Sequence, residues 1–419
     1  MDIVQKARCI FQKYVCDHCV GRQYAQLLSG YHNLHRGRLI RSLVAMTIDK
    51  EKLEPEDQQM DLLNFTGFKF HFLPLDLQSM RAKIKKRRCS VCGDIFKELD
   101  KYAERIEKEK RKKKIEFNTF LVGTKLSADL LKNEERLWER AGIDWCEPLK
   151  AELNREIGKR IEKRMKKKFD VRQPDVNLII NLSNNRVEIE LNPLFIQGEY
   201  QKLKRGIPQT KWPDGKYKTS VEEIVAKPFM KKTKGKGHKF HGLGREDIDA
   251  KCLAWRPFVL EILEPRRMLK KKDLSVLRKK IGCSVKVRRL RFSDIGYVRR
   301  IKEARWEKSY EAVIRCKDRI EKKDIRKLKG LIGEIRQQTP RRVLHRRSDR
   351  LRKRRVKKIR VKYINSKRLK LIVRGEAGLY IKELITGDNG RTHPSVSELL
   401  NNECECKQLD VVGIHKKKL

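Results

Sequence analysis

The segment RQPDVNLIINLSNNRVEIELNPLFI, from Arg172 to Ile196, marks a sharp change of composition along the chain. Its Val, Ile and Leu residues fall in two runs typical of β-strands, and the Asn-Asn pair between them predicts a turn. Charged runs with helical spacing dominate the residues before it. We therefore predict a domain boundary at about Val171, between an N-terminal domain of residues 1–170 and a C-terminal domain of residues 171–419.

The C-terminal domain carries further strand-like segments separated by helical ones. The strand candidates lie at Arg256–Leu263, Cys283–Phe292, Tyr310–Cys316, Lys357–Asn365 and Arg368–Gly375. The stretches KKDLSVLRKKIG and KKDIRKLKGLIGEI predict helices between them, and the Gly- and Lys-rich segment from Lys231 to Gly242 predicts a flexible loop. This pattern indicates an α+β domain with a mostly antiparallel sheet.

The N-terminal domain has the composition of a small α/β module. A β-like segment, FNTFLVGTKL, spans Phe117–Leu126. A helix is predicted from about Leu149 to Lys168, where Pro148 precedes acidic and basic residues at helical spacing. The charged run KYAERIEKEKRKKKIEF has little to bury, so it predicts a solvated helix or an arm that faces RNA.

The charge balance points to a polyanionic partner. Lys and Arg total 104 against 55 Asp and Glu, which gives a formal net charge of +49. Such a surface repels itself, and binding a polyphosphate relieves this repulsion and also releases condensed counterions. A ribosomal or chromatin protein could share this charge, but hydrophobic residues make up 39% of the chain and are spread along it, which indicates folded cores. Nucleic acid is therefore the expected partner.

Compartment and redox state follow from what the sequence lacks. No stretch reaches the roughly 18 uninterrupted apolar residues of a membrane span. The N-terminus also lacks the apolar region of a signal peptide. We therefore expect a cytoplasmic protein with no membrane partner. The eleven cysteines are an odd number in a large chain, which favours reduced thiols or metal ligation over disulfides.

Two Cys-x-x-Cys pairs predict a structural zinc site. They supply four thiolates, the ligand set that tetrahedral zinc prefers. The alternative is four unrelated buried cysteines, which the long loop between the pairs leaves open. His18 is expected to be a bystander, and Cys404 and Cys406 have the wrong spacing for a zinc knuckle. The predicted ligands are Cys16, Cys19, Cys89 and Cys92.

The segment Gly244-Arg-Glu-Asp-Ile-Asp249 places three acids within four residues of a very basic protein. One interpretation is a functional carboxylate. The other is a turn followed by a helix cap, with carboxylates that are merely solvated. The pattern alone leaves both open.

Residues 241–264, HGLGREDIDAKCLAWRPFVLEILE, resemble the signature of the archaeal and eukaryotic tenth pseudouridine synthase family. Other blocks agree in order: PDVNLII, VEIELNPLFIQGEYQKLKRGIPQTKWP, YKTSVEEIVAKPF, QQTPRRVLHRRSDRLRKRRV and GLYIKELITGDNGRTHPSVSELL. In the N-terminal half, CDHCVGRQYAQLLSGYHNLHRG, RCSVC and FNTFLVGTKL resemble that family's zinc-bearing, THUMP-containing RNA-binding domain. The resemblance thus implies a pseudouridine synthase catalytic domain behind a THUMP-containing domain.

The resemblance also implies a function. Members of this family make pseudouridine in the T-arm of tRNA, so we expect isomerisation of uridine 54, uridine 55 or both. The reaction needs no catalytic cofactor and no nucleotide cofactor, and zinc is expected only in a structural role. The expected partner is tRNA, and the protein is expected to be an archaeal enzyme that acts as a monomer.

In the family's Gly-Arg-x-Asp motif the Asp is the catalytic carboxylate, and it corresponds to Asp247 here. The resemblance implies a structural role for Asp249. Tyr310 matches the tyrosine that packs against the target uracil. Tyr380 and Lys382 resemble the Gly-Thr-Tyr-Ile-Arg block of TruB-type synthases, so Lys382 is expected to pair with Asp247. The arginines expected to bind the substrate are Arg245, Arg256, Arg341, Arg342, Arg346 and Arg347.

The sequence departs from the family pattern in two places. Only DGKYK stands where many members carry a cysteine-rich insert, so no second metal site is expected. The usual Leu-Gly-x-Gly-Arg-Pro-Phe is replaced by the shorter Leu253–Phe258, LAWRPF, which puts the geometry beside the active site in doubt.

Two other classes of function compete with this interpretation. A non-catalytic RNA chaperone or assembly factor could use the same basic surface. A THUMP-bearing methyltransferase or thiouridine synthetase would need a nucleotide or S-adenosylmethionine fold, and the sequence has neither a Walker loop nor a Gly-x-Gly-x-x-Gly after a strand.

Overall fold

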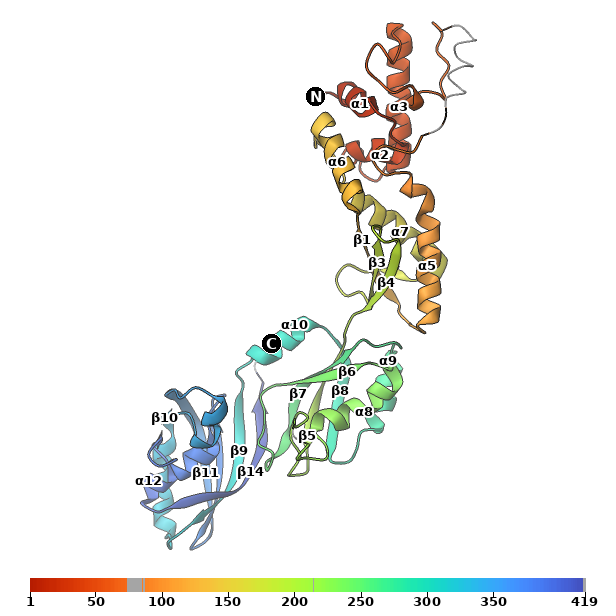
Figure 1. Cartoon of the computed structure of the whole chain (residues 1–419). Coiled ribbons are helices and arrows are strands. Elements are labelled where there is room, and N and C mark those ends of the chain that lie inside the picture. Colours follow the sequence, from red (N-terminus) through yellow and green to blue (C-terminus); the bar gives the residue numbers. More distant parts are fainter. Residues whose placement is uncertain (74–84, 86, 214, 417–419) are drawn as a thin grey trace. The chain divides into compact units, whose positions relative to one another are not determined.

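A computed structural model describes residues 1–73, 85, 87–213 and 215–416, with only the backbone of Arg346 described. The chain forms two compact units, Met1–Asn192 and Pro193–Leu419 (Figure 1). The division differs from the boundary expected at about Val171. The reason is that the hairpin after that residue completes the sheet of the first unit.

The first unit begins with a helical part. It contains α1 (Ile3–Phe11), α2 (Asp17–Gly21) and α3 (Asn33–Glu51). Helices α2 and α3 meet backbone to backbone at two glycines. A Cβ atom would lie 1.8 Å from the Asn33 carbonyl oxygen if added to Gly21, and 1.9 Å from the Asp17 carbonyl oxygen if added to Gly37. Only glycine permits this crossing, which fixes the segment that carries the first Cys-x-x-Cys pair.

The rest of the first unit is a sheet with helices. The strand order is β2-β1-β3-β4, with β1 and β3 parallel and β3 and β4 antiparallel. The apolar side of α7 packs near β1 and buries Leu153, Ile157 and Ile161. The expected strand and helix before the boundary are therefore present. The elements are α5 (Leu99–Lys112), β1 (Thr119–Lys125), α6 (Ala128–Ala141), α7 (Leu149–Met165), β2 (Lys168–Phe169), β3 (Val176–Asn181) and β4 (Arg186–Leu191).

The second unit is built on one long sheet, in the order β13-β10-β11-β12-β9-β14-β7-β5-β8, with β6 also paired to β7. Every pairing is antiparallel except β14 with β7, which confirms the expected α+β class and mostly antiparallel sheet. The strands are β5 (Leu194–Lys202), β6 (Gly237–Gly242), β7 (Lys251–Leu263), β8 (Val285–Ser293), β9 (Glu307–Cys316), β10 (Gly333–Gln337), β11 (Arg352–Asn365), β12 (Arg368–Gly375), β13 (Thr392–His393) and β14 (Cys404–His415).

Helices cover this sheet in three places and create a core at each, the smallest where α10 buries Val298 and Ile301 against Val259 of β7. Next to β5 and β8 lie α8 and α9 (Figure 1), where Ile196, Phe229 and Leu260 are fully buried. At the other end α11 and α12 help to bury Leu371 and Leu384. The helical elements are α8 (Val221–Thr233), α9 (Lys271–Lys279), α10 (Ile295–Glu303), η4 (Lys322–Leu331), η5 (Arg341–Arg346), α11 (Ile381–Thr386) and α12 (Val396–Leu400).

The predicted loop at Lys231–Gly242 is wrong. Helix α8 ends at Thr233, and β6 then pairs with β7 from Gly237 opposite Leu263 to Gly242 opposite Phe258. Its Lys and Gly content hides an alternating pattern that buries Phe240 while the flanking residues stay more exposed. The stretch KKDIRKLKGLIGEI is likewise 3-10 helix followed by strand β10 rather than one α-helix.

None of the helices in the described ranges is long and apolar enough to cross a membrane.

Candidate active site

The segment between β6 and β7, residues 243–250, carries Asp247 and its two acidic neighbours; we call it the acidic loop. Its start is tied to β7 by the Leu243 amide, which donates to the Pro257 carbonyl at 3.0 Å. It closes with the Ala250 amide donating to the Asp247 carbonyl at 3.1 Å. At Gly244 φ is +72°, a left-handed conformation that glycine adopts without strain.

Beneath the loop, Glu246 forms a buried ion pair with Arg256. The Arg256 Nε atom lies 3.2 Å from a Glu246 oxygen, and both side chains are almost fully buried. Arg256 also donates to the Leu243 carbonyl at 2.7 Å. We expected Arg256 to bind substrate, but it is only 1% exposed. It therefore holds the acidic loop against β7 instead of reaching a phosphate.

Three further buried polar side chains complete this support. Tyr200 donates its hydroxyl to Glu246 at 2.9 Å, and Gln209 donates to that hydroxyl at 2.8 Å. The Lys202 ammonium donates to the backbone carbonyls of Asp247 and Ile248 at 3.0 and 3.2 Å. Burial lowers the pKa of Lys202. Sequence reasoning missed these residues, because nothing local marks a strand residue that supports a loop some 40 positions later.

Above the loop, Asp247 lies between two cations. One carboxylate oxygen is 3.4 Å from the Lys382 ammonium and 3.5 Å from the Arg342 guanidinium. Its side chain is 34% exposed, in contrast to the buried Glu246 next to it. The structure thus brings Lys382 to Asp247, as the resemblance implied, and adds Arg342, which we had expected only to bind substrate.

Asp249 receives the shorter contact from Lys382, at 2.7 Å. Burial would raise the pKa of Asp249, but the hydrogen bond and charge of Lys382 outweigh it and lower the pKa. For Lys382 itself, burial acts to lower the pKa, and the hydrogen bond to Asp249 with the charges of both aspartates raises it. Asp249 therefore keeps Lys382 charged and holds it beside Asp247.

Arg342 belongs to η5 and links two carboxylates. Its Nε atom donates to Glu383 at 2.7 Å while its other end faces Asp247. Burial acts to lower the pKa of Arg342, but the hydrogen bond and charge of Glu383 raise it. Because Glu383 is almost fully buried on α11, it fixes the direction of this guanidinium. Glu383 was also missed from the sequence.

Tyr310 lies on β9, on the side of the sheet that faces the acidic loop. It packs against the small cluster of Cys252, Ala254 and Val411 and is partly buried. Burial, partly offset by the charge of Arg256, raises the pKa of Tyr310 to about 12. Its ring is therefore held as a neutral aromatic surface near Asp247.

Tyr380 caps α11 and is fixed through its backbone. Gln337 accepts from the Tyr380 amide and donates to its carbonyl, each at 2.9 Å. The Tyr380 hydroxyl accepts a hydrogen bond from Arg347 at 2.7 Å. This arrangement sets the start of the helix that carries Lys382 two residues later.

The remaining substrate arginines are solvent-facing where they are described. Arg245 and Arg341 are exposed, and Arg347 is exposed apart from its contact with Tyr380. The side chain of Arg346 lies outside the described part of the structure. The shortened segment Leu253–Phe258 lies within β7. Its pairing with β5 is irregular there, because Tyr200 is opposite Arg256 whereas Lys202 is opposite Cys252.

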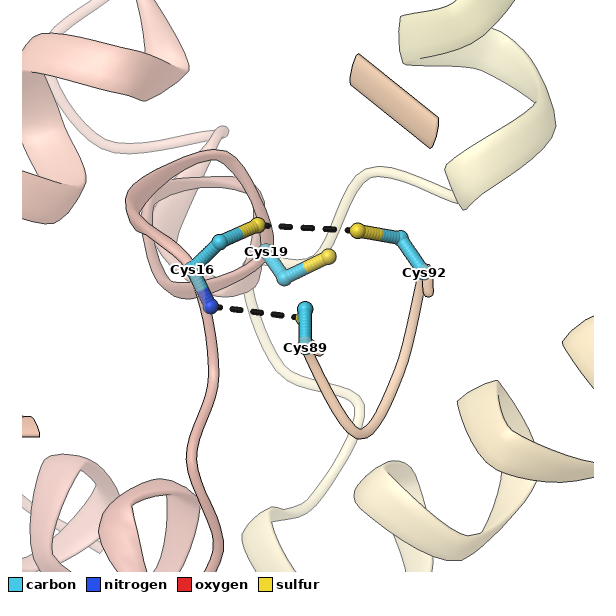
Figure 2. Close-up of side chains that lie close together, drawn as sticks. All are labelled: Cys16, Cys19, Cys89 and Cys92. Atoms are coloured by element: carbon cyan, nitrogen blue, oxygen red, sulfur yellow. Dashed lines mark hydrogen bonds between the residues drawn. The ribbon is translucent and has the colours of Figure 1, made fainter. Parts of the chain in front are cut away.

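A second candidate site lies in the first unit, where the four predicted cysteines converge (Figure 2). Their sulfur atoms all lie within 4.8 Å of one another. Cys16 and Cys19 come from the start of α2, and Cys89 and Cys92 come from a turn in which the Gly93 amide donates to the Cys89 carbonyl. The Cys16 sulfur is 3.6 Å from the Cys92 sulfur.

His18 stays outside this cluster. Its ring is hydrogen-bonded to Glu152 at 2.9 Å and stacked on Phe96, so it is a bystander as expected. Cys404 is also elsewhere, with its sulfur 3.2 Å from that of Cys316 on the neighbouring strand.

Two family models match this chain. The one described as "Pus10, C-terminal" matches residues 195–415, and the one described as "Pus10 THUMP domain, archaeal" matches residues 102–181. The tRNA pseudouridine synthase Pus10 of Methanothrix thermoacetophila is 38% identical over 427 residues, covering 96% of this chain and 91% of that protein. The enzyme of the same name from Pyrococcus furiosus is 38% identical over 418 residues, covering 98% of both.

A solved Cbf5-Nop10-Gar1 complex contains a chain with 20% identity and a TM-score of 0.32, covering 52% of this chain and 50% of that one. A similarity this low has no bearing on function.

The antiparallel sheet, the THUMP domain and the matched family models together define an enzyme of the pseudouridine synthase class, an isomerase. Within that class, the chain belongs to the Pus10 family.

Proposed function

We propose that the protein isomerises uridine 54, uridine 55 or both in the T-arm of tRNA, with Asp247 as the catalytic carboxylate. One observation carries the proposal: Asp247 is a partly open carboxylate held between the cations of Lys382 and Arg342, at 3.4 and 3.5 Å. The names of the relatives support tRNA as the substrate.

The chemistry suits this arrangement. The reaction breaks the bond between C1′ of the ribose and N1 of uracil, rotates the base and joins C1′ to C5, while N1 gains a proton and C5 loses one. It consumes no cofactor, and it needs an ionised carboxylate in a site that excludes water. Lys382 and Arg342 place two positive charges 3.4 and 3.5 Å from the Asp247 carboxylate.

The substrate must also leave its stack to reach Asp247. Flipping a nucleotide out of a folded arm costs unstacking energy, which aromatic and basic side chains offset. The Tyr310 ring offers the aromatic surface, and the exposed Arg341 and Arg347 offer phosphate contacts. The THUMP domain of the first unit would provide a further contact with the RNA. We also propose that the protein acts as a cytoplasmic monomer.

The four-cysteine cluster fits a structural zinc ion. A tetrahedral site with Zn–S bonds of about 2.3 Å places the sulfur atoms ~3.8 Å apart. The sulfur atoms here lie within 4.8 Å of one another, and three of the cysteines are buried. The site lies in the first unit, so zinc would stabilise the fold of that unit rather than take part in the isomerisation.

Metal analysis tests the zinc proposal. We expect one zinc per chain, and a chelator should lower the melting temperature of the protein and make four more thiols titratable. The variant Cys283→Ser, at an exposed cysteine far from the cluster in sequence, is the matched control for Cys89→Ser. Purified protein without metal, in which all four thiols already titrate freely, would rule the site out.

Pseudouridine mapping tests the catalytic proposal. An unmodified tRNA transcript treated with purified protein should gain pseudouridine in the T-arm, and the Asp247→Asn variant should leave it unmodified. Tight tRNA binding by both proteins without any pseudouridine would instead favour the RNA chaperone.

A further inference from the structure

The sheet of the second unit has a side that faces away from the acidic loop. On β11, Ile359, Val361 and Tyr363 pack into the core on the side of Tyr310. Residues that alternate with them point to the other side, because successive side chains of a strand lie on opposite faces. On β11, β12 and β9 this other side is mostly charged and exposed or partly exposed, with Val313 and Ile372 as apolar members.

Seven cations occupy this side of the three strands, and we call them the basic sheet face. Cross-strand registers place them in adjacent rows, with Lys358 opposite Arg374, Lys362 opposite Lys370 and Arg368 opposite Arg315. Five of the seven are exposed, and Lys370 and Arg374 are partly exposed. The members are Arg315, Lys358, Arg360, Lys362, Arg368, Lys370 and Arg374.

Few carboxylates balance these charges. Glu311 is 3.0 Å from Lys370, and Glu307 is 2.9 Å from Arg374. The other five cations have no carboxylate within ion-pair distance among the residues that the structure describes. Three like-charged pairs therefore face each other directly across the strands, an arrangement that destabilises a sheet. A bound polyanion would relieve this repulsion, and the relief would contribute to the free energy of binding.

Protection of an exposed edge does not account for the pattern. Beyond Val356, where its pairing with β10 ends, β11 pairs with no other strand on that side among the described residues, and charged side chains on such an edge prevent aggregation. That explains only the three cations of β11, which are Lys358, Arg360 and Lys362. The cations continue onto β12 and β9, which are paired on both sides and have no edge to protect.

We propose that the basic sheet face binds the phosphate backbone of the tRNA substrate outside the T-arm. This rests on the proposed function, since a T-arm uridine at Asp247 occupies the opposite side of the sheet. Alternate residues along a strand are ~6.7 Å apart and neighbouring strands are about 4.8 Å apart, so the cations form a regular grid.

The binding is to the backbone and not to bases. Beside the cations on this face lie Ser309, Glu311, Val313 and Ile372, none of which has an aromatic ring. The ring of His415, next to Ser309, is engaged in a hydrogen bond with the Ser309 hydroxyl at 2.8 Å. Lysine and arginine contacts to phosphate position an RNA without reading its sequence. The basic sheet face would therefore raise affinity for any tRNA that carries the target uridine.

A triple variant tests the proposal in the full chain: Lys358→Gln, Arg360→Gln and Lys362→Gln. All three residues are exposed, and none has an ion pair to lose. The matched control is Lys271→Gln, Lys272→Gln and Lys279→Gln, three exposed lysines of α9 with the same total charge. The two probes are an unmodified full-length tRNA transcript and an isolated T-arm stem-loop of the same sequence.

The wild-type protein should bind the full-length tRNA more tightly than the stem-loop. In the triple variant, the ratio of the affinity for full-length tRNA to the affinity for the stem-loop should be about tenfold or more lower than in the wild type. The slope of log K against log salt for full-length tRNA should also become shallower by about two to three. The control should change the ratio less than about twofold. Equal losses on both RNAs, an unchanged ratio or an equal loss in the control would each overturn the proposal.

A second bound tRNA is a separate outcome. If the triple variant loses only a second equivalent of tRNA in a stoichiometric titration, the face binds another molecule and the proposal is wrong. Failure of the proposed function looks different, because the wild-type protein would then leave both RNAs without pseudouridine whatever their affinities.

Discussion

Glu246 and Asp247 are neighbours in sequence and opposites in environment. Glu246 is buried, in an ion pair with Arg256 and a hydrogen bond from Tyr200, so its oxygens are occupied by the protein. Asp247 is a third exposed and makes only contacts of 3.4 and 3.5 Å with its cations. The buried carboxylate of Glu246 therefore holds the loop in place, while that of Asp247 stays available for a substrate.

The largest expected effect is on catalysis. Asp247→Asn should lower the rate of pseudouridine formation by at least roughly 10³-fold, within the range that loss of an essential acid or base group produces. The melting temperature should barely change, because exposed ion pairs contribute little to stability. Single-turnover kinetics and thermal denaturation measure the two effects. A variant that unfolds more easily would show that Asp247 also supports the fold.

Glu246→Gln should lower the stability of the protein more, and the catalytic rate less, than Asp247→Asn does. The change leaves the Arg256 charge buried without its partner, which costs about 3–5 kcal/mol of stability. Chemical denaturation of this variant beside Asp247→Asn measures the difference. Any fraction that remains folded should keep more activity than Asp247→Asn. Equal stability in the two variants would contradict the structural role given to Glu246.

The next expected effect is on the pH dependence of stability, through the buried Lys308. It is buried below the loop, and its ammonium has one hydrogen bond, to the Trp306 carbonyl, among the described residues. Burial and the charge of Arg256 lower the pKa of Lys308 to about 8. Between this value and the ordinary value near 10.4, the unfolded chain holds the proton and the folded chain does not. The free energy of unfolding therefore rises as pH rises through this window.

The size of that rise is on the order of 3 kcal/mol. Urea denaturation of the wild type and of Lys308→Met from pH 7 to 11 measures it, and the variant should lack this part of the pH dependence. The difference in free energy of unfolding between the wild type and Lys308→Met could instead stay constant across this pH range. That result would show that Lys308 keeps its charge inside the fold.

The smallest expected effect belongs to Asp249. Its side chain is 68% exposed, so Asp249→Asn should cost less than about 1 kcal/mol of stability. Losing its charge frees Lys382 to move toward Asp247, and the rate of pseudouridine formation should change only several-fold. A loss as large as that of Asp247→Asn would assign Asp249 a direct part in the reaction.

Much of the fold could be predicted from local patterns. Most strands of the second unit carry an alternating apolar pattern that is long enough to be identified from the sequence. The helix that begins at Leu149 is marked locally by the preceding proline and by its charge pattern. Strand β6 was missed because its glycines and lysines mimic a loop, and only pairing with β7 makes it a strand. The two compact units divide after Asn192 and not at about Val171, because the hairpin of β3 and β4 joins the sheet through β1, far earlier in the chain.

For the site, the sequence by itself determined the Gly-Arg-Glu-Asp motif, the two cysteine pairs and the basic character of the chain, because these are properties of neighbouring residues and of composition. Only the tertiary structure decided that Arg256 is a buried support, that Arg342 joins Lys382 beside Asp247, and that seven cations share one side of a sheet. Burial and ion pairing depend on residues distant in the chain, and folding alone brings these together.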